Sequence, residues 1–353
     1  MSRTVSVPGH EPFAVASPWW AHVEPVAQRL GPDRPVLRLV SVSGGEGGRD
    51  GLVRYQVEPG EPVADHPLRA PWARPGGPGA LLDWAGRELD GLLRGDPVQV
   101  KTWNLSCVYR LDTVRGTAWL KASPAWAADE AAAICLVRRH APELVPEPLA
   151  TAPYRTVTLG ANGVSWRELG ARGASAVVRD WVAVQAALAG SVPGAPLDVR
   201  REFRRFDGFA VEGLPELAAR LPELLAELAG AGLPDTLVHG DLHPGNWVSD
   251  GTRHAVIDWS DHYQGNPAAD ITRLTGWLPE DQVEEVADTW VRAWRERWPG
   301  SRPERALAPM RVLGPVLDAI TYQRFLDNIE PSERVYHEND PVDELTRAVA
   351  ELV

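Results

Sequence analysis

The sequence is poor in several kinds of residue, and each scarcity argues against a class of protein. Cysteine occurs twice in 353 residues, as Cys107 and Cys135, and neither lies in a Cys-x-x-Cys or zinc-binding spacing. We therefore expect neither a disulfide-stabilised scaffold nor a zinc site, and we expect a reducing cytoplasm. No apolar run approaches the roughly 20 residues that span a bilayer. The N-terminal MSRTVSVP has no apolar core, so no secretory signal is expected.

Net positive charge is also missing, because 48 Asp and Glu outnumber 36 Lys and Arg and leave a net charge of −12. This balance argues against binding to nucleic acid or to an anionic membrane surface. It is compatible with a cationic small molecule as partner. Lys101 and Lys121 are the only lysines, and arginine supplies all other positive charge.

The most informative stretch is HGDLHPGN at 239–246, which is followed by a carboxylate at Asp258. Asp241 and Asn246 have the order and spacing H-x-D-x-x-x-x-N of the kinase catalytic loop. Phosphoryl transfer needs a carboxylate that positions the acceptor hydroxyl and two oxygen ligands that hold Mg²⁺ on the nucleotide phosphates. Asp241 is thus a candidate base, and Asn246 and Asp258 are candidate Mg²⁺ ligands.

The residues around this motif predict a hairpin that brings the candidate ligands together. Thr236–Val238 is a short apolar run that ends at the motif, and Pro244-Gly245 marks a loop. Asp250-Gly251 is a turn signal, and residues 255–257 form a buried-strand run that ends at Asp258. Taken alone, an Asp-x-x-x-x-Asn is usually a solvated loop and a histidine beside a strand is usually structural. The presence of all these elements together favours the kinase interpretation.

Lys121 ends a β-prone run, Thr-Ala-Trp-Leu-Lys, and Glu130 follows on the first turns of a helix predicted at about 127–140. In a nucleotide kinase, a strand lysine contacts the α- and β-phosphates and a helix glutamate holds that lysine. The alternative is that Lys121 is a solubilising charge on an edge strand and Glu130 a helix-dipole residue. The residues downstream at 241, 246 and 258 favour the kinase assignment.

The whole chain predicts an α+β fold with two kinase-like lobes. We expect an accessory N-terminal α/β module at 1–65, with a helix from Trp19 to about Leu30 and strands at 36–42 and 52–57 around a glycine-rich tip. A Pro/Gly-rich linker and a helix at about 80–94 occupy 66–96. A β-rich small lobe follows at 97–160, a hinge turn at 160–163, and a helical large lobe over 161–353. Helices of the large lobe are expected at about 174–189, 213–230, 280–297, 304–329 and 341–352.

Over roughly residues 70–350, the chain resembles the aminoglycoside phosphotransferase family of kinase-like enzymes. The resemblance depends on Trp-x-Lys at 119–121, the 239–246 motif, Ile-Asp-Trp at 257–259, and Gly-Asn-Pro-Ala-Ala-Asp at 265–270. It implies a two-lobed kinase fold, ATP or GTP as donor, and Mg²⁺. By the resemblance Asp241 is the catalytic base, Asn246 and Asp258 bind Mg²⁺, Lys121 binds the phosphates and Glu130 orients Lys121. Asp270 would be structural.

Two segments depart from the family pattern. Trp-Asn-Leu-Ser at 103–106 stands where a glycine-rich phosphate loop would be, so Ser106 and backbone N–H groups are expected to contact the phosphates instead. The hinge segment lacks the family's acidic-Leu-Gly sequence. Substrate choice belongs to the helical part of the chain, where acidic residues are candidates to face a cationic acceptor or to lie on a solvated helix face. They are Asp261, Asp318, Asp327, Glu330 and Glu333.

We therefore expect a phosphotransferase that moves the γ-phosphoryl group of ATP or GTP to a hydroxyl of a small molecule, such as an aminoglycoside, an amino sugar or another natural product. One alternative is a metal-dependent hydrolase in which His239, Asp241, His243, Asp258 and His262 form a two-metal cluster. That reading leaves Lys121 and Glu130 without a role. The other alternative is a nucleotide-binding protein without turnover.

Overall fold

The computed structural model of the chain describes residues 2–16, 19–44, 51–60, 64–160, 164–165, 170–249 and 254–352. The fold is mixed α+β and divides into two compact units. The first unit comprises Met1–Ala131, Glu147–Gly160 and Arg324–Asn339. The second comprises Ala132–Pro146, Ala161–Gln323 and Asp340–Val353. No helix in the described part of the chain is both long and apolar enough to cross a membrane.

The N-terminal part of the first unit is a small four-stranded sheet with the order β2-β1-β4-β3. Its strands are β1 (Arg3–Ser6), β2 (Phe13–Val15), β3 (Val36–Ser43) and β4 (Gly51–Val57), and β1 runs parallel to β4. The predicted helix is shorter than expected, because α1 spans Glu24–Leu30. Its start is set by a proline in the first turn, a position that proline favours. Residues 45–50 of the glycine-rich tip lie outside the described residues.

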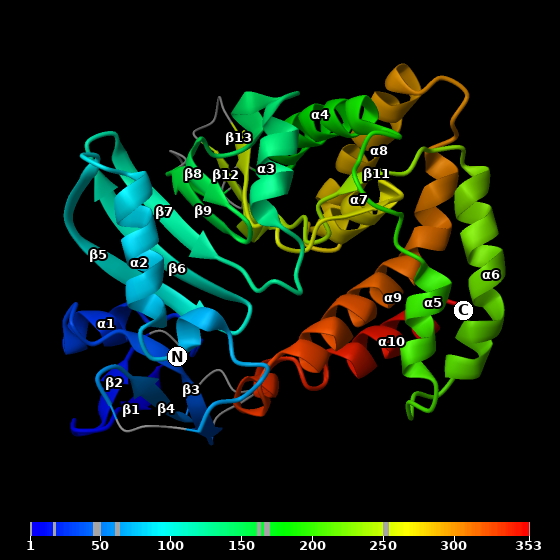
Figure 1. Cartoon of the computed structure of the whole chain (residues 1–353). Helices are drawn as coiled ribbons and strands as arrows, with labels where there is room; N and C mark the ends of the chain where they lie inside the picture. The colour runs from blue at the N-terminus through cyan, green and yellow to red at the C-terminus, as the bar shows by residue number, and fades with distance from the viewer. Residues whose placement is uncertain are drawn as a thin grey trace. The chain divides into compact units, whose positions relative to one another are not determined.

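A five-stranded antiparallel sheet with the order β5-β6-β7-β9-β8 forms the rest of the unit. The strands are β5 (Leu93–Trp103), β6 (Ser106–Thr113), β7 (Gly116–Ala122), β8 (Pro148–Ala152) and β9 (Arg155–Leu159). Helix α2 (Gly77–Glu88) lies along this sheet (Figure 1), and its Leu81 and Trp84 share a buried core with Tyr109 and Leu120. The predicted helix at about 80–94 is therefore shifted toward the N-terminus, and the segment expected to be a linker contains its first residues.

The N-terminal sheet is joined to the five-stranded sheet by hydrogen bonds. The backbone N–H of Val23 donates to the carbonyl of Val100, and that of Thr102 donates to the carbonyl of Ala21, both at 3.0 Å. The amide of Gln99 bonds both the N–H and the carbonyl of Val36, at 2.8 and 2.7 Å. Residues 1–65 thus make main-chain contacts with β5, and whether they form a separable module remains a prediction.

Glu330 and Glu333 are not part of a solvated helix face, because both are almost fully buried within the first unit. Glu330 forms ion pairs with Arg38 and Arg69, each at 3.1 Å. Glu333 accepts hydrogen bonds from the backbone N–H groups of Leu39 and Asn104. Burial raises the pKa of Glu333 to about 8. The partners of these two carboxylates are those of structural residues.

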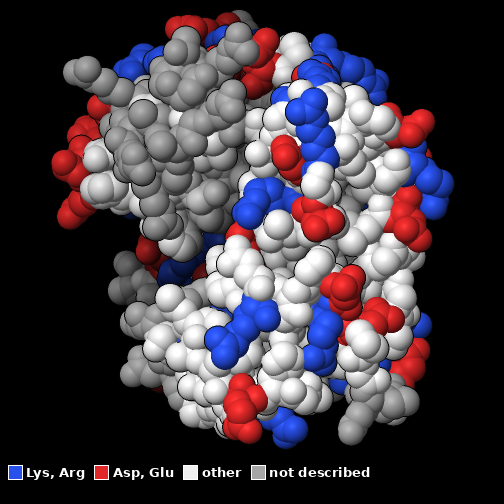
Figure 2. Space-filling view, turned by 90° about the vertical axis from the view of Figure 1, so that its left-hand side faces the viewer, with Lys and Arg blue, Asp and Glu red and all other residues white. Residues whose placement is uncertain are grey.

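On the face drawn in Figure 2, Lys and Arg side chains are interspersed with Asp and Glu. Among the residues coloured there, no continuous patch of one sign stands out. The coloured part of this face therefore shows no concentration of negative charge.

The second unit is mainly helical (Figure 1). Each of the five large-lobe helices that the sequence predicted is present, with ends within about four residues of those expected. They are α4 (Gly170–Leu188), α6 (Leu214–Gly230), α8 (Glu280–Arg297), α9 (Glu304–Asn328) and α10 (Asp340–Ala350). The structure adds α5 (Val199–Phe203) and α7 (Ala268–Thr275), which the sequence analysis did not predict.

Short strands in this unit carry the candidate catalytic motif. Strands β11 (Thr236–Val238) and β14 (Tyr263–Gly265) pair antiparallel, as do β12 (Trp247–Ser249) and β13 (His254–Val256). Trp247 lies opposite Val256, so the predicted pairing of the strands on either side of the hairpin is confirmed. The turn signal Asp250-Gly251 lies outside the described residues.

Candidate active site

The loop that follows β11 is held by Asp270 of α7. The carboxylate of Asp270 accepts hydrogen bonds from the backbone N–H groups of His239 and Gly240, at 3.0 and 3.2 Å. It also accepts from the side chains of Trp181 and Gln185. Burial raises the pKa of Asp270 to about 6, although these hydrogen bonds act in the opposite direction. These contacts are what a structural role for Asp270 requires.

Gly240 is required by the shape of this loop. Its φ is +85°, a conformation that L side chains rarely adopt, and a Cβ there would lie 2.2 Å from the carbonyl oxygen of Asp261. The glycine therefore permits the sharp turn that places Asp241 after the strand.

Both carboxylate oxygens of Asp241 have partners in the second unit. Oδ1 accepts from Nη2 and Nε of Arg273, at 2.8 and 3.2 Å. Oδ2 accepts from the amide of Asn246 at 3.1 Å and lies 3.4 Å from Nε2 of His243. Burial alone would raise the pKa of Asp241, but the hydrogen bond from His243 and the charge of Arg273 outweigh it and hold the pKa well below its usual range. Asp241 is therefore an ionised, oriented carboxylate.

Asn246 and Asp258 are brought together by the hairpin. The backbone N–H of Ile257 donates to the carbonyl of Asn246 at 2.9 Å. Asp258 directly follows Ile257, so this hydrogen bond places its backbone beside Asn246. The Nδ2 of Asn246 donates to the backbone carbonyl of Asp241 at 2.9 Å as well as to its carboxylate. An amide that donates through Nδ2 leaves its carbonyl oxygen as the candidate metal-binding atom. Asp258 has a φ of +65°, an uncommon conformation for a non-glycine residue that is often found at functional sites.

These two residues fit Mg²⁺ by chemistry, since an amide oxygen and a carboxylate are hard oxygen donors. Mg²⁺ is usually held by one or two carboxylates together with the substrate phosphates, so a dedicated protein cage is not needed.

In the first unit, Nζ of Lys121 lies 2.8 Å from a carboxylate oxygen of Glu130, and both side chains are mostly buried. Strand β7 is the central strand of its sheet, and Lys121 lies opposite Val108 on one side and Thr156 on the other. The alternative in which Lys121 is an edge-strand charge is therefore wrong. Glu130 is the first residue of α3 (Glu130–Arg138), and it forms the ion pair that a kinase small lobe requires.

Ser106 is buried at the start of β6, where its hydroxyl accepts a hydrogen bond from Nε1 of Trp103 at 2.9 Å. Its predicted contact with the nucleotide phosphates remains a prediction. At the hinge, Gly160 donates its N–H to the carbonyl of Thr117 at 2.7 Å, and a Cβ there would lie 2.9 Å from that oxygen. Residues 161–163 of the predicted hinge turn lie outside the described residues.

The side chains proposed for the hydrolase alternative do not form its metal cluster. No three His, Cys, Asp or Glu side chains in the described ranges are arranged to hold one metal ion. His239 is buried, and its ring nitrogens bond the carbonyl of Ile257 at 3.0 Å and the N–H of Asp241 at 3.2 Å. These bonds require the proton on Nε2 and a neutral ring, and burial lowers the pKa of His239 to about 4. His239 is therefore a structural member of the loop.

Sequence reasoning missed several residues that surround Asp241. Arg273 of α7 bonds Asp241 and also lies 2.9 Å from Asp318 of α9, which the sequence analysis left between an acceptor contact and a solvated face. Asp318 is in fact largely buried. Trp277 is 49% exposed, and its ring lies 5.2 Å from that of His243. Nothing in the spacing of these residues connects them to Asp241, because the contacts depend on the tertiary packing of α7 and α9.

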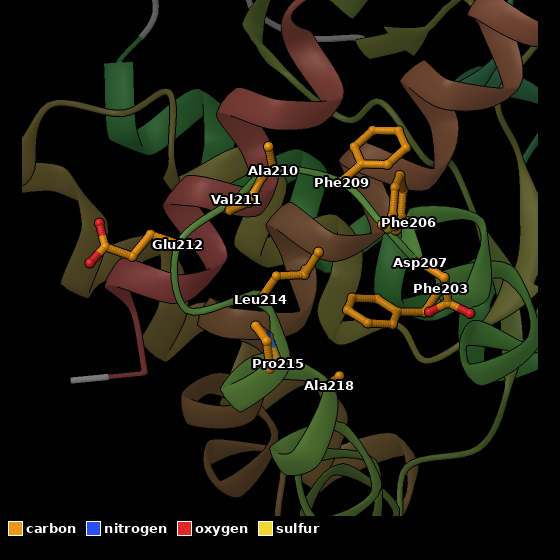
Figure 3. Close-up of a pocket in the computed structure, with 11 residues that line it drawn as sticks. Phe203, Phe206, Asp207, Phe209, Ala210, Val211, Glu212, Leu214, Pro215 and Ala218 are labelled. Carbon is orange, nitrogen blue, oxygen red and sulfur yellow. The ribbon is translucent and has the colours of Figure 1, made fainter.

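A pocket of about 490 Å³ lies in the second unit between α5 and the start of α6. Figure 3 shows aromatic and aliphatic side chains from this segment around it, with the carboxylate of Glu212 directed away from the aromatic rings. Phe203, Phe206 and Phe209 form edge-on ring contacts there. Its lining is mainly apolar and includes none of the candidate catalytic residues.

The second unit thus contains an ionised Asp241 beside oxygen donors at 246 and 258, and the first unit contains the Lys121–Glu130 ion pair. These are the residue types that a kinase-type phosphotransferase uses. Residues 98–307 match the model of the phosphotransferase enzyme family, and the chain belongs to that family. Comparison with the sequences of curated proteins gives no match.

Solved structures show the same fold. The choline kinase LicA of Streptococcus pneumoniae has a TM-score of 0.57 at 14% identity, over 78% of this chain and 98% of that one. An ethanolamine kinase of Plasmodium vivax has a TM-score of 0.54 at 12% identity, over 76% and 84%. The macrolide 2′-phosphotransferase MphH of Brachybacterium faecium has a TM-score of 0.52 at 22% identity, over 76% and 97%. At these identities the likeness shows the kinase-like fold alone.

Proposed function

We propose that the protein transfers the γ-phosphoryl group of a nucleoside triphosphate, ATP or GTP, to a hydroxyl group of a small molecule. The observation that carries this proposal is the arrangement of Asp241, Asn246 and Asp258 around the β12–β13 hairpin in a member of a phosphotransferase family. Phosphoryl transfer needs little covalent help from a protein, so a site that positions and neutralises charge is sufficient.

Asp241 is the residue that receives the acceptor hydroxyl. Because its carboxylate is ionised, it accepts a hydrogen bond from the hydroxyl and aims the oxygen lone pair at the γ-phosphorus. The proton moves to Asp241 as the new O–P bond forms, and the nucleoside diphosphate leaves. Asn246 and Asp258 would hold Mg²⁺, which neutralises charge on the phosphates when bound.

Lys121 is the contact to the α- and β-phosphates, and Glu130 holds its ammonium group. The ammonium group of a mostly buried lysine needs a fixed counter-charge, and the 2.8 Å pair with Glu130 supplies it. We further propose that Ser106 and neighbouring backbone N–H groups act in place of a glycine-rich loop.

The acceptor is proposed to be a small alcohol that carries a cationic or amino group, such as an aminoglycoside, an amino sugar or a related natural product. Named functions among proteins of similar fold include choline, ethanolamine and macrolide phosphorylation. In this chain the half-exposed ring of Trp277 lies against His243, which itself contacts Asp241. An indole face of this kind attracts cations.

The test is a nucleotide-consumption screen with Mg²⁺ and either ATP or GTP, across aminoglycosides, amino sugars, amino alcohols, macrolides and nucleosides. Each active acceptor is then checked for a new phosphate monoester by mass spectrometry. An Asp241→Asn variant serves as the control, and its rate should fall by about 10²–10⁴ with nucleotide affinity nearly unchanged. Nucleotide binding without transfer to any acceptor would instead support a binding protein without turnover, and near-normal transfer by the variant would remove Asp241 from the reaction.

A further inference from the structure

Arg273 donates two hydrogen bonds to Asp241, and the proposed reaction gives Arg273 no role. Its Nη2 and Nε both approach the same oxygen, Oδ1, while Oδ2 faces Asn246 and His243. The two oxygens of the carboxylate are therefore not equivalent. One is held by a cation, and the other is turned toward the residue proposed to bind Mg²⁺.

Arg273 is itself fixed from the opposite side. Its Nη1 lies 2.9 Å from Oδ2 of Asp318 on α9, and the hydroxyl of Tyr322 lies 3.5 Å from its Nη2. Asp318 also pairs with Arg347 of α10 at 3.3 Å. The side chains of Arg273 and Asp318 are only 16% and 14% exposed. The guanidinium is thus locked between two carboxylates from different parts of the unit.

Burying such a network is poorly explained by stability alone. A buried ion pair often contributes no more to stability than well-packed apolar residues of similar volume, because desolvation offsets the Coulomb attraction. A planar guanidinium does, however, fix the orientation of a carboxylate with more precision than an ammonium group. A misplacement of about 1 Å at a reacting group is enough to slow a reaction by about 10²-fold.

We propose that Arg273 is a positioning residue for phosphoryl transfer, in which it fixes the rotation of the Asp241 carboxylate while Asp318 anchors the guanidinium. The proposal rests on the proposed function. Arg273 does not contact the nucleotide in this scheme and acts only through Asp241. Its removal should therefore affect the rate of transfer and not the binding of Mg²⁺-ATP.

The experiment is a double-mutant cycle with Arg273→Met, Asp241→Asn and the double variant. The reaction is Mg²⁺-dependent ATP hydrolysis, with water as the acceptor, so that no identified acceptor is needed. We expect Arg273→Met to lower kcat by about 10²-fold with less than about a twofold change in KM for Mg²⁺-ATP. In the Asp241→Asn background the same substitution should cost less than about twofold, because residues that act as a unit are strongly non-additive.

Two further variants complete the design. Arg273→Lys keeps the charge but loses the planar fork, so we expect it to recover only part of the rate. Arg292→Met on α8 removes an exposed arginine, 63% exposed, and should keep the parent kcat. Thermal melting of every variant identifies any that fail to fold, and for those the milder Arg273→Lys takes the place of the methionine variant in the cycle.

The outcomes separate the two proposals. An Arg273→Met effect that persists in full in the Asp241→Asn background, or that falls on KM alone, would overturn the assignment of Arg273. An unchanged kcat in Arg273→Met would do the same. If the unaltered chain neither binds nor hydrolyses Mg²⁺-ATP or Mg²⁺-GTP, the proposed function itself fails.

Discussion

At the scale of single residues, the loop at 239–246 holds one titratable side chain in its charged form and another in its neutral form. Asp241 stays ionised because His243 and Arg273 outweigh its burial. His239, two residues away, is buried and neutral with both nitrogens hydrogen-bonded. The same short motif thus contains one residue arranged for chemistry and another arranged for structure.

Asp258→Ala should weaken Mg²⁺-dependent nucleotide binding as well as the rate, because a hard cation loses an oxygen ligand. Nucleotide affinity measured by calorimetry over a series of Mg²⁺ concentrations checks this. The affinity of the parent should rise with Mg²⁺ much more steeply than that of the variant. Asp261→Ala is a control that changes a nearby carboxylate in the same segment. An identical Mg²⁺ dependence in parent and Asp258→Ala would remove Asp258 from the metal site.

His239 should make the free energy of unfolding depend on pH. Burial lowers its pKa from 6.5 to about 4, so the folded protein binds fewer protons than the unfolded chain between these values. The stability contributed by the neutral ring is present above pH 6.5 and is lost as the pH falls toward 4. Between pH 7 and pH 5 this loss should amount to about 2 kcal/mol.

Urea unfolding of the parent and of His239→Gln at both pH values measures this contribution. The difference in unfolding free energy between the two proteins should shrink by about 2 kcal/mol from pH 7 to pH 5. Comparing the proteins at each pH cancels the titration of Asp270, whose raised pKa has the opposite effect in the same range. A difference that stays constant with pH would show that His239 is not buried neutral.

At the scale of elements, α7 is the part that organises the catalytic loop. Its Asp270 accepts the N–H groups of His239 and Gly240, and its Arg273 holds Asp241. One short helix therefore supports both the backbone and the carboxylate of the loop.

Asp270→Asn should lower both stability and rate while keeping the size of the side chain. The hydrogen-bonding partners of the Asp270 carboxylate are all donors, so the NH₂ group of the new asparagine must face at least one N–H group. The backbone N–H of Gly240 bonds Oδ1, whereas Trp181, Gln185 and the N–H of His239 bond Oδ2. Leaving the buried N–H of Gly240 unsatisfied costs about 1–3 kcal/mol. Urea unfolding and kcat measure the effects, with Asp180→Asn on the exposed side of α4 as a control. A parent-like stability and kcat would contradict the role of α7.

The elements also show what the sequence predicted and why the rest was out of reach. The hairpin that joins Asn246 and Asp258 was predictable because turn and strand signals are local. The Lys121–Glu130 pair was predictable because a strand and the next helix are neighbours in sequence. Helix α7 was missed because it has only 8 residues and no long hydrophobic period. Strands β1 and β2 were missed because they are short and β1 pairs in parallel with β4, far along the chain.

The contacts of Arg273 illustrate the same limit for the site. Its partners Asp241 and Asp318 lie 32 and 45 residues away in sequence. From the sequence, Asp318 was predicted only as one of several acidic residues in the helical region, and Arg273 was given no role. No spacing rule connects the loop after β11 with α7 and α9. Only packing within the unit brings them together.

At the scale of the whole molecule, we predict that residues 1–65 are an accessory to the kinase core. They contain a complete small sheet with its own buried core, centred on Trp20 and Tyr55. They also bond β5 through Val23 and Ala21, and Arg38 is one of two arginines that neutralise the buried Glu330. The prediction that the module is separable therefore has to be tested against the cost of these contacts.

We expect deletion of residues 1–65 to leave Mg²⁺-nucleotide binding in place but to lower stability. The sheet β5–β9 that carries Lys121, together with Glu130, remains complete in the shortened chain. The loss of Arg38 leaves Glu330 with Arg69 alone, and breaking one side of a buried ion pair typically costs about 3–5 kcal/mol. Arg38→Met in the full chain removes this contact without removing the module, so the part of the loss due to the ion pair can be measured separately. Calorimetric nucleotide affinity and thermal melting of both proteins are the measurements. If the chain without residues 1–65 has the same melting temperature as Arg38→Met and still binds nucleotide, the module is separable. A deleted chain that cannot bind nucleotide, while Arg38→Met binds normally, would show that residues 1–65 belong to the kinase core.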